Sequence, residues 1–194
     1  TAYILGDSSN SPLPAMIEEA VRLEHYGATM IVLICNTAHY FIDEIRKSLS
    51  VPMPSIVEET VKFLRANGKS MPAILATDGT LKSEAYQKKL SQLGMGYVTP
   101  TNDEQKTVMD VIYRYVKRGI PAPPEMLGGV IESLISRGCD SVIAGCTEIP
   151  LALKNLGNIA GVVDPMEVLA YKVIKSFNKT PTGFSPEFKN YIND

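Results

Sequence analysis

The sequence lacks an excess of positive charge, a long apolar run and a framework of paired cysteines. Its 19 Lys and Arg residues are balanced by 21 Asp and Glu, for a net charge of −2. A nucleic-acid-binding role therefore loses its main support, because no basic surface is available to phosphates. No apolar run approaches the roughly 18 residues that cross a bilayer, and no signal peptide heads the chain. We therefore expect a cytoplasmic protein that binds no membrane.

The cysteine content also excludes a disulfide scaffold. Three cysteines, Cys35, Cys139 and Cys146, are an odd number and stand far apart, which favours reduced thiols. The chain is 45% hydrophobic and 21% charged, an ordinary globular composition. At about 150 residues per domain, its 194 residues allow one large domain or two small lobes.

Helical and strand-like patterns alternate along the chain. This alternation predicts an α/β protein with parallel sheets covered on both faces by helices. The predicted strands span residues 30–34, 55–57, 71–76, 95–99, 141–145 and 162–163. The predicted helices span residues 12–26, 36–49, 58–66, 81–93, 103–118, 124–137 and 165–177, before a tail or packed arm from Asn178.

An internal repeat indicates two pseudo-symmetric lobes. In each copy a glycine, Gly27 or Gly138, precedes a buried strand, and a cysteine follows that glycine by eight positions. We predict that lobe 1 comprises residues 1–67 plus 165–194 and lobe 2 residues 68–164, with the active site in the crevice between them. If the lobes are equivalent, about 41 residues carrying the first strands of lobe 1 are expected before Thr1.

The repeat places Cys35 and Cys146 at the carboxyl ends of parallel strands, where α/β proteins bind ligands. Facing lobes would bring the two thiols to opposite sides of one small molecule. One thiolate could then remove a proton from a carbon atom while the other thiol delivers a proton to the opposite face. Cys139 has no matching thiol, and we expect it to be a buried hydrophobic residue.

Other chemistries have weaker support. His39 lies one helical turn after Cys35, but two local ligands without a CxxC motif do not predict a metal site. His25 is expected at a surface or helix end. The chain has no GxGxxG motif, and Phe63 stands where a phosphate-binding loop ending in Gly68-Lys69-Ser70 needs glycine, so nucleotide binding is not predicted. The hydroxyl-rich segment 76–80 opens a helix and suits a carboxylate as well as helix capping.

Three motifs together resemble the aspartate/glutamate racemase family, closest to its aspartate racemase branch. They are Cys35-Asn36-Thr37-Ala38-His39, Ala76-Thr77-Asp78-Gly79-Thr80 and Gly145-Cys146-Thr147-Glu148-Ile149. The glutamate branch usually carries His at the position of Glu148. The resemblance implies two similar α/β lobes, a homodimer, and racemisation of an acidic amino acid without pyridoxal phosphate or metal.

The resemblance also implies roles for particular residues. Cys35 and Cys146 correspond to the two bases, and Lys117 to the cation that receives the side-chain carboxylate of the substrate. The α-amino and α-carboxylate groups are expected to contact Asn36, Thr37, Thr77, Thr80 and Thr147. The family's Gly-rich first loop and an Arg would fall before Thr1. Two alternatives remain open: a related dicarboxylate isomerase or decarboxylase, and a non-catalytic amino-acid-binding relative.

Overall fold

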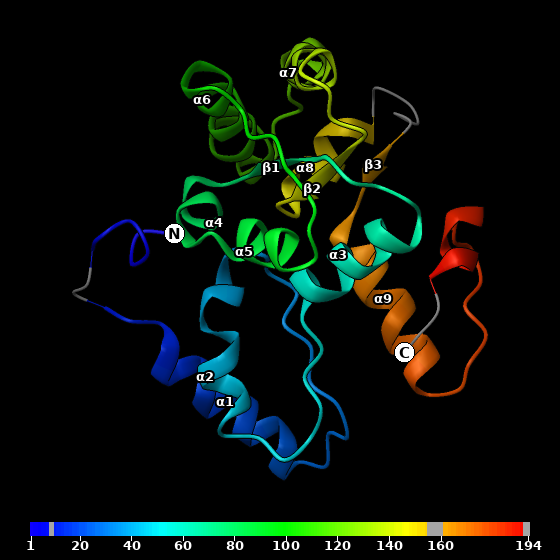
Figure 1. Ribbon diagram of the computed structural model, residues 1–194. Coiled ribbons are helices and arrows are strands. Elements are labelled where there is room, and N and C mark those ends of the chain that lie inside the picture. The colour runs from blue at the N-terminus through cyan, green and yellow to red at the C-terminus, as the bar shows by residue number, and fades with distance from the viewer. Residues whose placement is uncertain (8–9, 155–160, 192–194) are drawn as a thin grey trace.

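A three-stranded parallel sheet lies at the centre of the part of the chain that the structure describes (Figure 1). The structure is a computed structural model, and it describes residues 1–7, 10–154 and 161–191. Strand β1 (Pro72–Ala76) pairs with β2 (Ser141–Gly145), and β2 pairs with β3 (Val162–Val163). The register places Ala76 opposite Gly145, so β1 and β2 end at the same edge of the sheet. The expected α/β class is confirmed.

Helices make up most of the remaining described structure. The α-helices are α1 (Leu13–His25), α2 (Ile42–Arg46), α3 (Ile56–Ala66), α4 (Asp78–Ser83), α5 (Ala85–Gln92), α6 (Asn102–Asp110), α7 (Pro124–Ser136), α8 (Glu148–Leu153) and α9 (Pro165–Ser176). The 3-10 helices are η1 (Thr37–Phe41), η3 (Val116–Arg118) and η5 (Pro186–Asn190), and η2 (Val111–Tyr115) is a π-helix.

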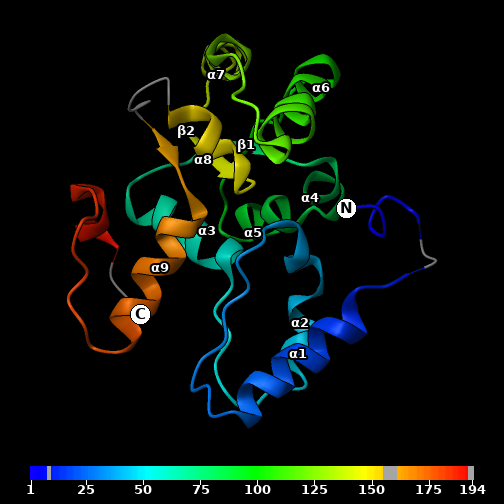
Figure 2. The same ribbon diagram turned by 180° about the vertical axis from the view of Figure 1, so that it is seen from behind.

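Every residue of β1 and β2 is buried, because helices cover both faces of the sheet. Alternate side chains enter different hydrophobic clusters. Ile74 and Ile143 pack with α3, α5 and α9, whereas Leu75 and Ala144 pack with α6, η2, α7 and α8. The two helical layers stand on opposite sides of the sheet in both views (Figures 1 and 2).

A third hydrophobic cluster lies away from the sheet, around α1 and α2 (Figures 1 and 2). It buries Ala20 of α1 and Ile45 of α2 together with Ile31 and Met53 from the neighbouring segments. The segment that ends at Cys35 leaves this cluster and reaches the edge of the sheet, where η1 contacts α4. The division of the chain into two lobes at the stated residues stays a prediction.

The strand expected at residues 30–34 is absent, so the expectation of a parallel sheet in lobe 1 is wrong for the described residues. Val32 and Ile34 are exposed, and the backbone N–H of Ile31 donates to the carbonyl of Pro52. An apolar run becomes a strand only where a neighbouring strand accepts its hydrogen bonds. Within the described segments, no strand pairs with this one.

Two other predicted strands also differ. Residues 55–57 begin helix α3 instead, because the Ser55 side chain accepts the Glu58 backbone N–H and caps the helix. Residues 95–99 form only one parallel bridge, between Val98 and Ala73.

Three predicted helices are subdivided. The helix expected over 36–49 is η1 followed by α2, and that over 103–118 runs from α6 through η2 to η3. The helix over 81–93 is divided between α4 and α5 at Glu84, whose φ is 57°. Sequence periodicity does not report such local changes of backbone, because the same residue face stays buried on either side of them.

The segment from Asn178 is a packed arm as far as the structure describes it. Phe188 and Tyr191 are buried against Phe63 of α3 and Tyr171 of α9. Residues 192–194 lie outside the described part. Across the described residues, no helix has the length and apolar character that a membrane span requires.

Candidate active site

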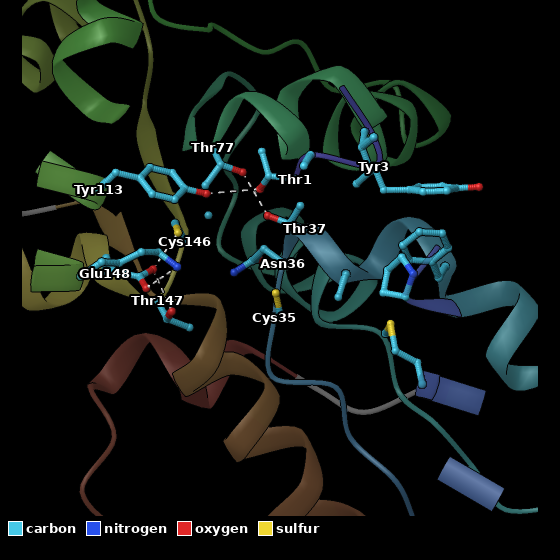
Figure 3. A pocket seen from close by; sticks show the side chains of 18 residues that line it. Thr1, Tyr3, Cys35, Asn36, Thr37, Thr77, Tyr113, Cys146, Thr147 and Glu148 are labelled. Carbon is cyan, nitrogen blue, oxygen red and sulfur yellow. Dashed lines mark hydrogen bonds and ion pairs between the residues drawn. The ribbon is translucent and has the colours of Figure 1, made fainter. Parts of the chain in front are cut away.

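A pocket of about 500 Å³ lies where the carboxyl ends of β1 and β2 meet the segment that begins with Cys35. Its lining contains every predicted site residue except Thr80, and the roles of these residues remain predictions. Residues 1–4 and Tyr113 also line it, which sequence reasoning did not anticipate. Figure 3 shows Cys146, Thr147 and Glu148 on one side of the pocket, with Cys35, Asn36 and Thr37 on the other.

Cys146 directly follows β2, and the glycine before it has a steric reason. A Cβ at Gly145 would lie 3.0 Å from the Leu75 carbonyl oxygen and 3.1 Å from the Ala76 Cβ, so a larger residue would push the end of β2 away from β1 by a few tenths of an ångström. The Cys146 thiol is buried and donates to Oε2 of Glu148 at 2.8 Å. Burial and the neighbouring Glu148 carboxylate raise the pKa of Cys146 to about 12. The resting residue is therefore a thiol.

Glu148, in the first turn of α8, has protein partners for both of its carboxylate oxygens within the pocket. Its Oε2 accepts hydrogen bonds from the Cys146 thiol and, at 3.0 Å, from the Thr147 hydroxyl. Its Oε1 lies 3.2 Å from Nζ of Lys117. Burial alone would raise the pKa of Glu148, but the hydrogen bonds from Cys146, Thr147 and Lys117 lower it overall. The sequence offered one signal for this contact, a carboxylate two residues after a candidate catalytic thiol.

Cys35 is exposed, and a buried histidine holds its backbone in place. Nδ1 of His39 lies 2.8 Å from the Cys35 carbonyl oxygen, and Nε2 lies 2.9 Å from the backbone nitrogen of Ile56. Because the Ile56 N–H can only donate, Nε2 accepts and Nδ1 carries the proton of a neutral ring. Burial lowers the pKa of His39 to about 4, which keeps this neutral form. His39 therefore has no ring nitrogen left for a metal ion.

Asn36 presents an unused hydrogen-bond donor at the pocket. Its side chain is only 3% exposed, and its Oδ1 accepts from the Tyr86 hydroxyl at 2.5 Å. Its Nδ2 is buried and has no hydrogen-bond partner in the part of the chain that the structure describes. A buried amide N–H costs free energy when unpaired, so this nitrogen is suited to an acceptor atom of a ligand.

Three threonine hydroxyls join the two sides of the pocket. Oγ1 of Thr37 lies 3.0 Å from that of Thr77 and 2.8 Å from that of Thr80. Thr77 also caps α4 by accepting the Thr80 backbone N–H. Thr80 is completely buried and lies behind the other two, so its contacts fix the positions of Thr37 and Thr77.

Lys117 lines the pocket but is paired there with Glu148. Its Nζ also lies 5.2 Å from the centre of the Tyr113 ring. Burial alone would lower the pKa of Lys117, yet the pairing with Glu148 raises it overall, so the side chain is cationic. A substrate carboxylate that reached Lys117 would have to share it with Glu148.

The remaining candidates lie outside the pocket. Cys139 is buried in the cluster on one face of the sheet, as expected, and burial raises its thiol pKa. His25 is the last residue of α1 and is exposed, also as expected. No three His, Cys, Asp or Glu side chains in the described ranges gather to hold a metal ion.

Comparison with known proteins identifies relatives over nearly the whole chain. A family model described as Asp/Glu/Hydantoin racemase matches residues 4–173. The chain is 32% identical over 163 residues to the broad specificity amino-acid racemase RacX of Bacillus subtilis (strain 168), covering 84% of this chain and 71% of that protein.

Two solved structures have the same fold. The structure of an aspartate racemase homologue from Pyrococcus horikoshii OT3 superposes with a TM-score of 0.76 at 28% identity, over 86% of this chain and 74% of that one. The Picrophilus torridus aspartate racemase gives a TM-score of 0.75 at 25% identity, over 97% and 78% of the two chains.

Proposed function

This chain belongs to the Asp/Glu/hydantoin racemase family, and on that premise we propose that it interconverts L- and D-aspartate by proton transfer between Cys35 and Cys146. The reaction needs no pyridoxal phosphate and no metal ion. The observation that carries the proposal is the meeting of both thiols in one pocket, each on a different side of it (Figure 3).

The proposed step inverts the α-carbon with two bases. One cysteine, as thiolate, forms an S–H bond by removing the α-proton, and the electron pair of the broken C–H bond stays on the α-carbon. The other cysteine, as thiol, gives its proton to the opposite face and becomes the thiolate. The two cysteines exchange protonation states in each turnover, so their titration belongs to the pair.

The polar groups around the thiols suit the backbone groups of an amino acid. The unpartnered Nδ2 of Asn36 and the hydroxyls of Thr37, Thr77 and Thr147 line the same pocket. Hydrogen-bond donors at the α-carboxylate would stabilise the negative charge that develops there as the α-proton leaves. We assign these residues to the α-amino and α-carboxylate groups, with Thr80 supporting Thr37 and Thr77 from behind.

A broader substrate range is the second candidate. Lys117, the cation assigned to the side-chain carboxylate, is already neutralised by Glu148. No other lysine or arginine side chain is present among the described residues that line the pocket. Amino acids with neutral side chains would fit this balance of charge, and the relative RacX is named for broad specificity.

The decisive experiment follows the α-proton directly. The full chain is incubated in D₂O with L- or D-aspartate, and in parallel with glutamate and alanine, while NMR records deuterium at the α-carbon and polarimetry records inversion. We expect exchange together with inversion for aspartate. Faster exchange of alanine than of aspartate would favour the broader range, and retention of both the α-proton and the optical rotation with every substrate would refute a racemase.

Matched cysteine variants test the assignment of the two bases. Cys35→Ala and Cys146→Ala should each abolish racemisation, because either change leaves one face of the substrate without a proton carrier. Cys139→Ala is the control, since that thiol is buried outside the pocket. Full racemisation by either of the first two variants would overturn the two-thiol mechanism. Light scattering of the same samples checks the predicted homodimer.

A further inference from the structure

The Glu148 carboxylate contacts the Cys146 thiol and has no contact with the Cys35 thiol. Its three side-chain partners, Cys146, Thr147 and Lys117, lie within 2.8–3.2 Å. Figure 3 shows Cys146, Thr147 and Glu148 together on one side of the pocket. The Cys35 thiol is exposed, and it has no such carboxylate contact among residues 1–7, 10–154 and 161–191. The two thiols therefore have unequal surroundings.

Two simpler roles for Glu148 fit the contacts poorly. A residue that only caps a helix directs its side chain to backbone N–H groups. The Glu148 carboxylate contacts its own N–H, but also two hydroxyl or thiol donors and one ammonium group. A residue that binds the substrate ammonium needs a free oxygen, whereas both oxygens of Glu148 are occupied and its side chain is 16% exposed. The contacts are those of a group that holds another side chain.

We propose that Glu148 is a positioning residue that holds the proton on Cys146, so that the resting site carries Cys146 as the proton donor of the thiol pair. This inference rests on the proposed racemisation for its consequence in catalysis. Its structural part, control of the Cys146 proton by Glu148, stands independently of turnover.

The proton balance shows what such a residue does in a catalytic cycle. When Cys146 donates, its S–H bond breaks, a C–H bond forms at the substrate, and the electron pair remains on sulfur. The new thiolate then lies beside the Glu148 carboxylate, and the two negative charges repel each other. Cys146 thiolate is thereby a strong base for the reverse reaction, while Lys117 limits the repulsion by pairing with the carboxylate.

The charged groups around Cys146 should affect the loss of its proton in opposite directions, which provides a test. They are Glu148 of α8, Lys117 of η3, and the titratable Tyr113 of η2, with Cys35 across the pocket. Thr77, which follows the paired strand β1, is uncharged. Removing the carboxylate should make the Cys146 proton easier to lose, and removing the ammonium group should make it harder to lose.

The first experiment measures alkylation of Cys146 by iodoacetamide at pH 8. In a Cys35→Ala, Cys139→Ala background, Cys146 is the sole cysteine of the chain, so the intact mass reports its modification. Glu148→Gln should accelerate alkylation about threefold for each unit by which the thiol pKa falls, because tenfold more thiolate is partly offset by lower nucleophilicity. Lys117→Met should slow it. Glu132→Gln on the exposed face of α7 removes the same charge and should change nothing.

The pair of variants separates electrostatics from loss of structure. A loosened pocket would expose the thiol and speed alkylation in both Glu148→Gln and Lys117→Met. Rates that change in opposite directions support the proposal. Rates that rise together, or a Glu148→Gln rate equal to that of Glu132→Gln, would overturn it.

The second experiment measures catalysis in the chain that retains all three cysteines. Glu148→Gln should lower kcat for aspartate racemisation at least tenfold and change KM less than threefold, because both Glu148 oxygens are occupied by protein groups and the residue acts through the Cys146 proton. A loss confined to KM would make Glu148 a substrate ligand and overturn the proposal. If the unsubstituted protein exchanges no α-proton, the proposed function fails, and the alkylation rates alone decide whether Glu148 holds the Cys146 proton.

Discussion

At the scale of single residues, His39 links the Cys35 loop to the rest of the molecule. Its ring joins the Cys35 carbonyl to the first N–H of α3, and the side chain is 4% exposed. Because Nε2 must accept from Ile56, a second ring proton would remove that hydrogen bond and place a charge in a buried site. Protonation of His39 therefore destabilises the native position of Cys35.

Because the folded protein disfavours a protonated His39, we predict that its free energy of unfolding falls at acidic pH. The pKa of His39 is lowered from 6.5 to about 4 by burial, so the unfolded chain takes up the proton first as the pH falls. Above pH 6.5, His39 is neutral in both states and the free energy of unfolding is at its full value. As the pH falls from 6.5 toward 4, the free energy of unfolding decreases, by about 3 kcal/mol at most at 1.36 kcal/mol per pKa unit. Urea unfolding at pH 7.5, 6, 5 and 4.5 measures the change in the free energy of unfolding.

Two histidine variants isolate this contribution from that of titrating carboxylates. His39→Gln can keep both hydrogen bonds without titrating, so its stability should fall less between pH 6.5 and 4.5 than that of the unsubstituted chain. His25→Gln, at the exposed end of α1, should leave the pH dependence unchanged. An identical pH dependence in His39→Gln and the unsubstituted chain would refute the prediction.

The pocket residues show which parts of a site a sequence can predict. Cys35 and Cys146 could be identified because the same spacing of glycine, apolar run and cysteine occurs twice in the sequence, and both reach the pocket although the run before Cys35 forms no strand. The ion pair between Lys117 and Glu148 could not be predicted, because it depends on how η3 and α8, which are separated in the sequence by α7 and β2, approach each other. Thr80 illustrates the same limit: its type suits a ligand, but its depth behind Thr37 is a property of packing.

At the scale of elements, the junction of α4 and α5 directs a buried tyrosine toward the pocket. Glu84 ends α4 and precedes α5 in a left-handed conformation, with φ 57° and ψ 21°. Two residues later, Tyr86 is fully buried, and its hydroxyl donates to Oδ1 of Asn36. The turn at Glu84 thus contributes to the orientation of a pocket side chain.

The left-handed residue predicts a stabilising substitution. An L-residue other than glycine pays about 1–2 kcal/mol in this conformation, and the exposed Glu84–Lys88 ion pair offsets little of that cost. Glu84→Gly should therefore raise the free energy of unfolding by about 0.5–1 kcal/mol after the entropy of glycine in the unfolded chain is counted. Glu132→Gly, in the ordinary helical backbone of α7, should lower it by about 1 kcal/mol. Urea unfolding of both variants measures whether the free energy of unfolding rises for Glu84→Gly and falls for Glu132→Gly. A lower free energy of unfolding for Glu84→Gly would contradict the explanation.

The segment 30–34 shows why one element was predicted wrongly. Five consecutive apolar residues fit a buried strand, yet Val32 is 40% and Ile34 57% exposed. The strand at residues 141–145 has a similar composition and is fully buried between β1 and β3. The difference lies in the neighbours that supply hydrogen bonds, and a local pattern carries no information about them.

At the scale of the whole molecule, the C-terminal arm belongs to the core that supports one face of the sheet. The ring of Phe188 lies 4.6 Å from that of Phe63 and 5.0 Å from those of Tyr171 and Phe184, measured between centroids. Tyr191 donates a hydrogen bond to Glu59, a buried residue of α3. The sequence left the arm undecided because prolines and glycine interrupt its periodicity, while its burial depends on aromatic side chains that are widely spaced along the chain.

A buried arm predicts a large loss of stability from a change far from the pocket. Phe188 is 4% exposed, so Phe188→Ala should lower the free energy of unfolding by about 3–5 kcal/mol, through lost transfer free energy and the cavity that remains. Phe177→Ala removes the same atoms from a side chain that is 48% exposed and should cost less than about 1 kcal/mol. Urea unfolding compares the two variants. A loss below about 1 kcal/mol for Phe188→Ala would mean that the arm unfolds separately from the sheet. Because none of residues 178–191 lines the pocket, the KM for substrate should stay unchanged in both variants wherever they remain folded.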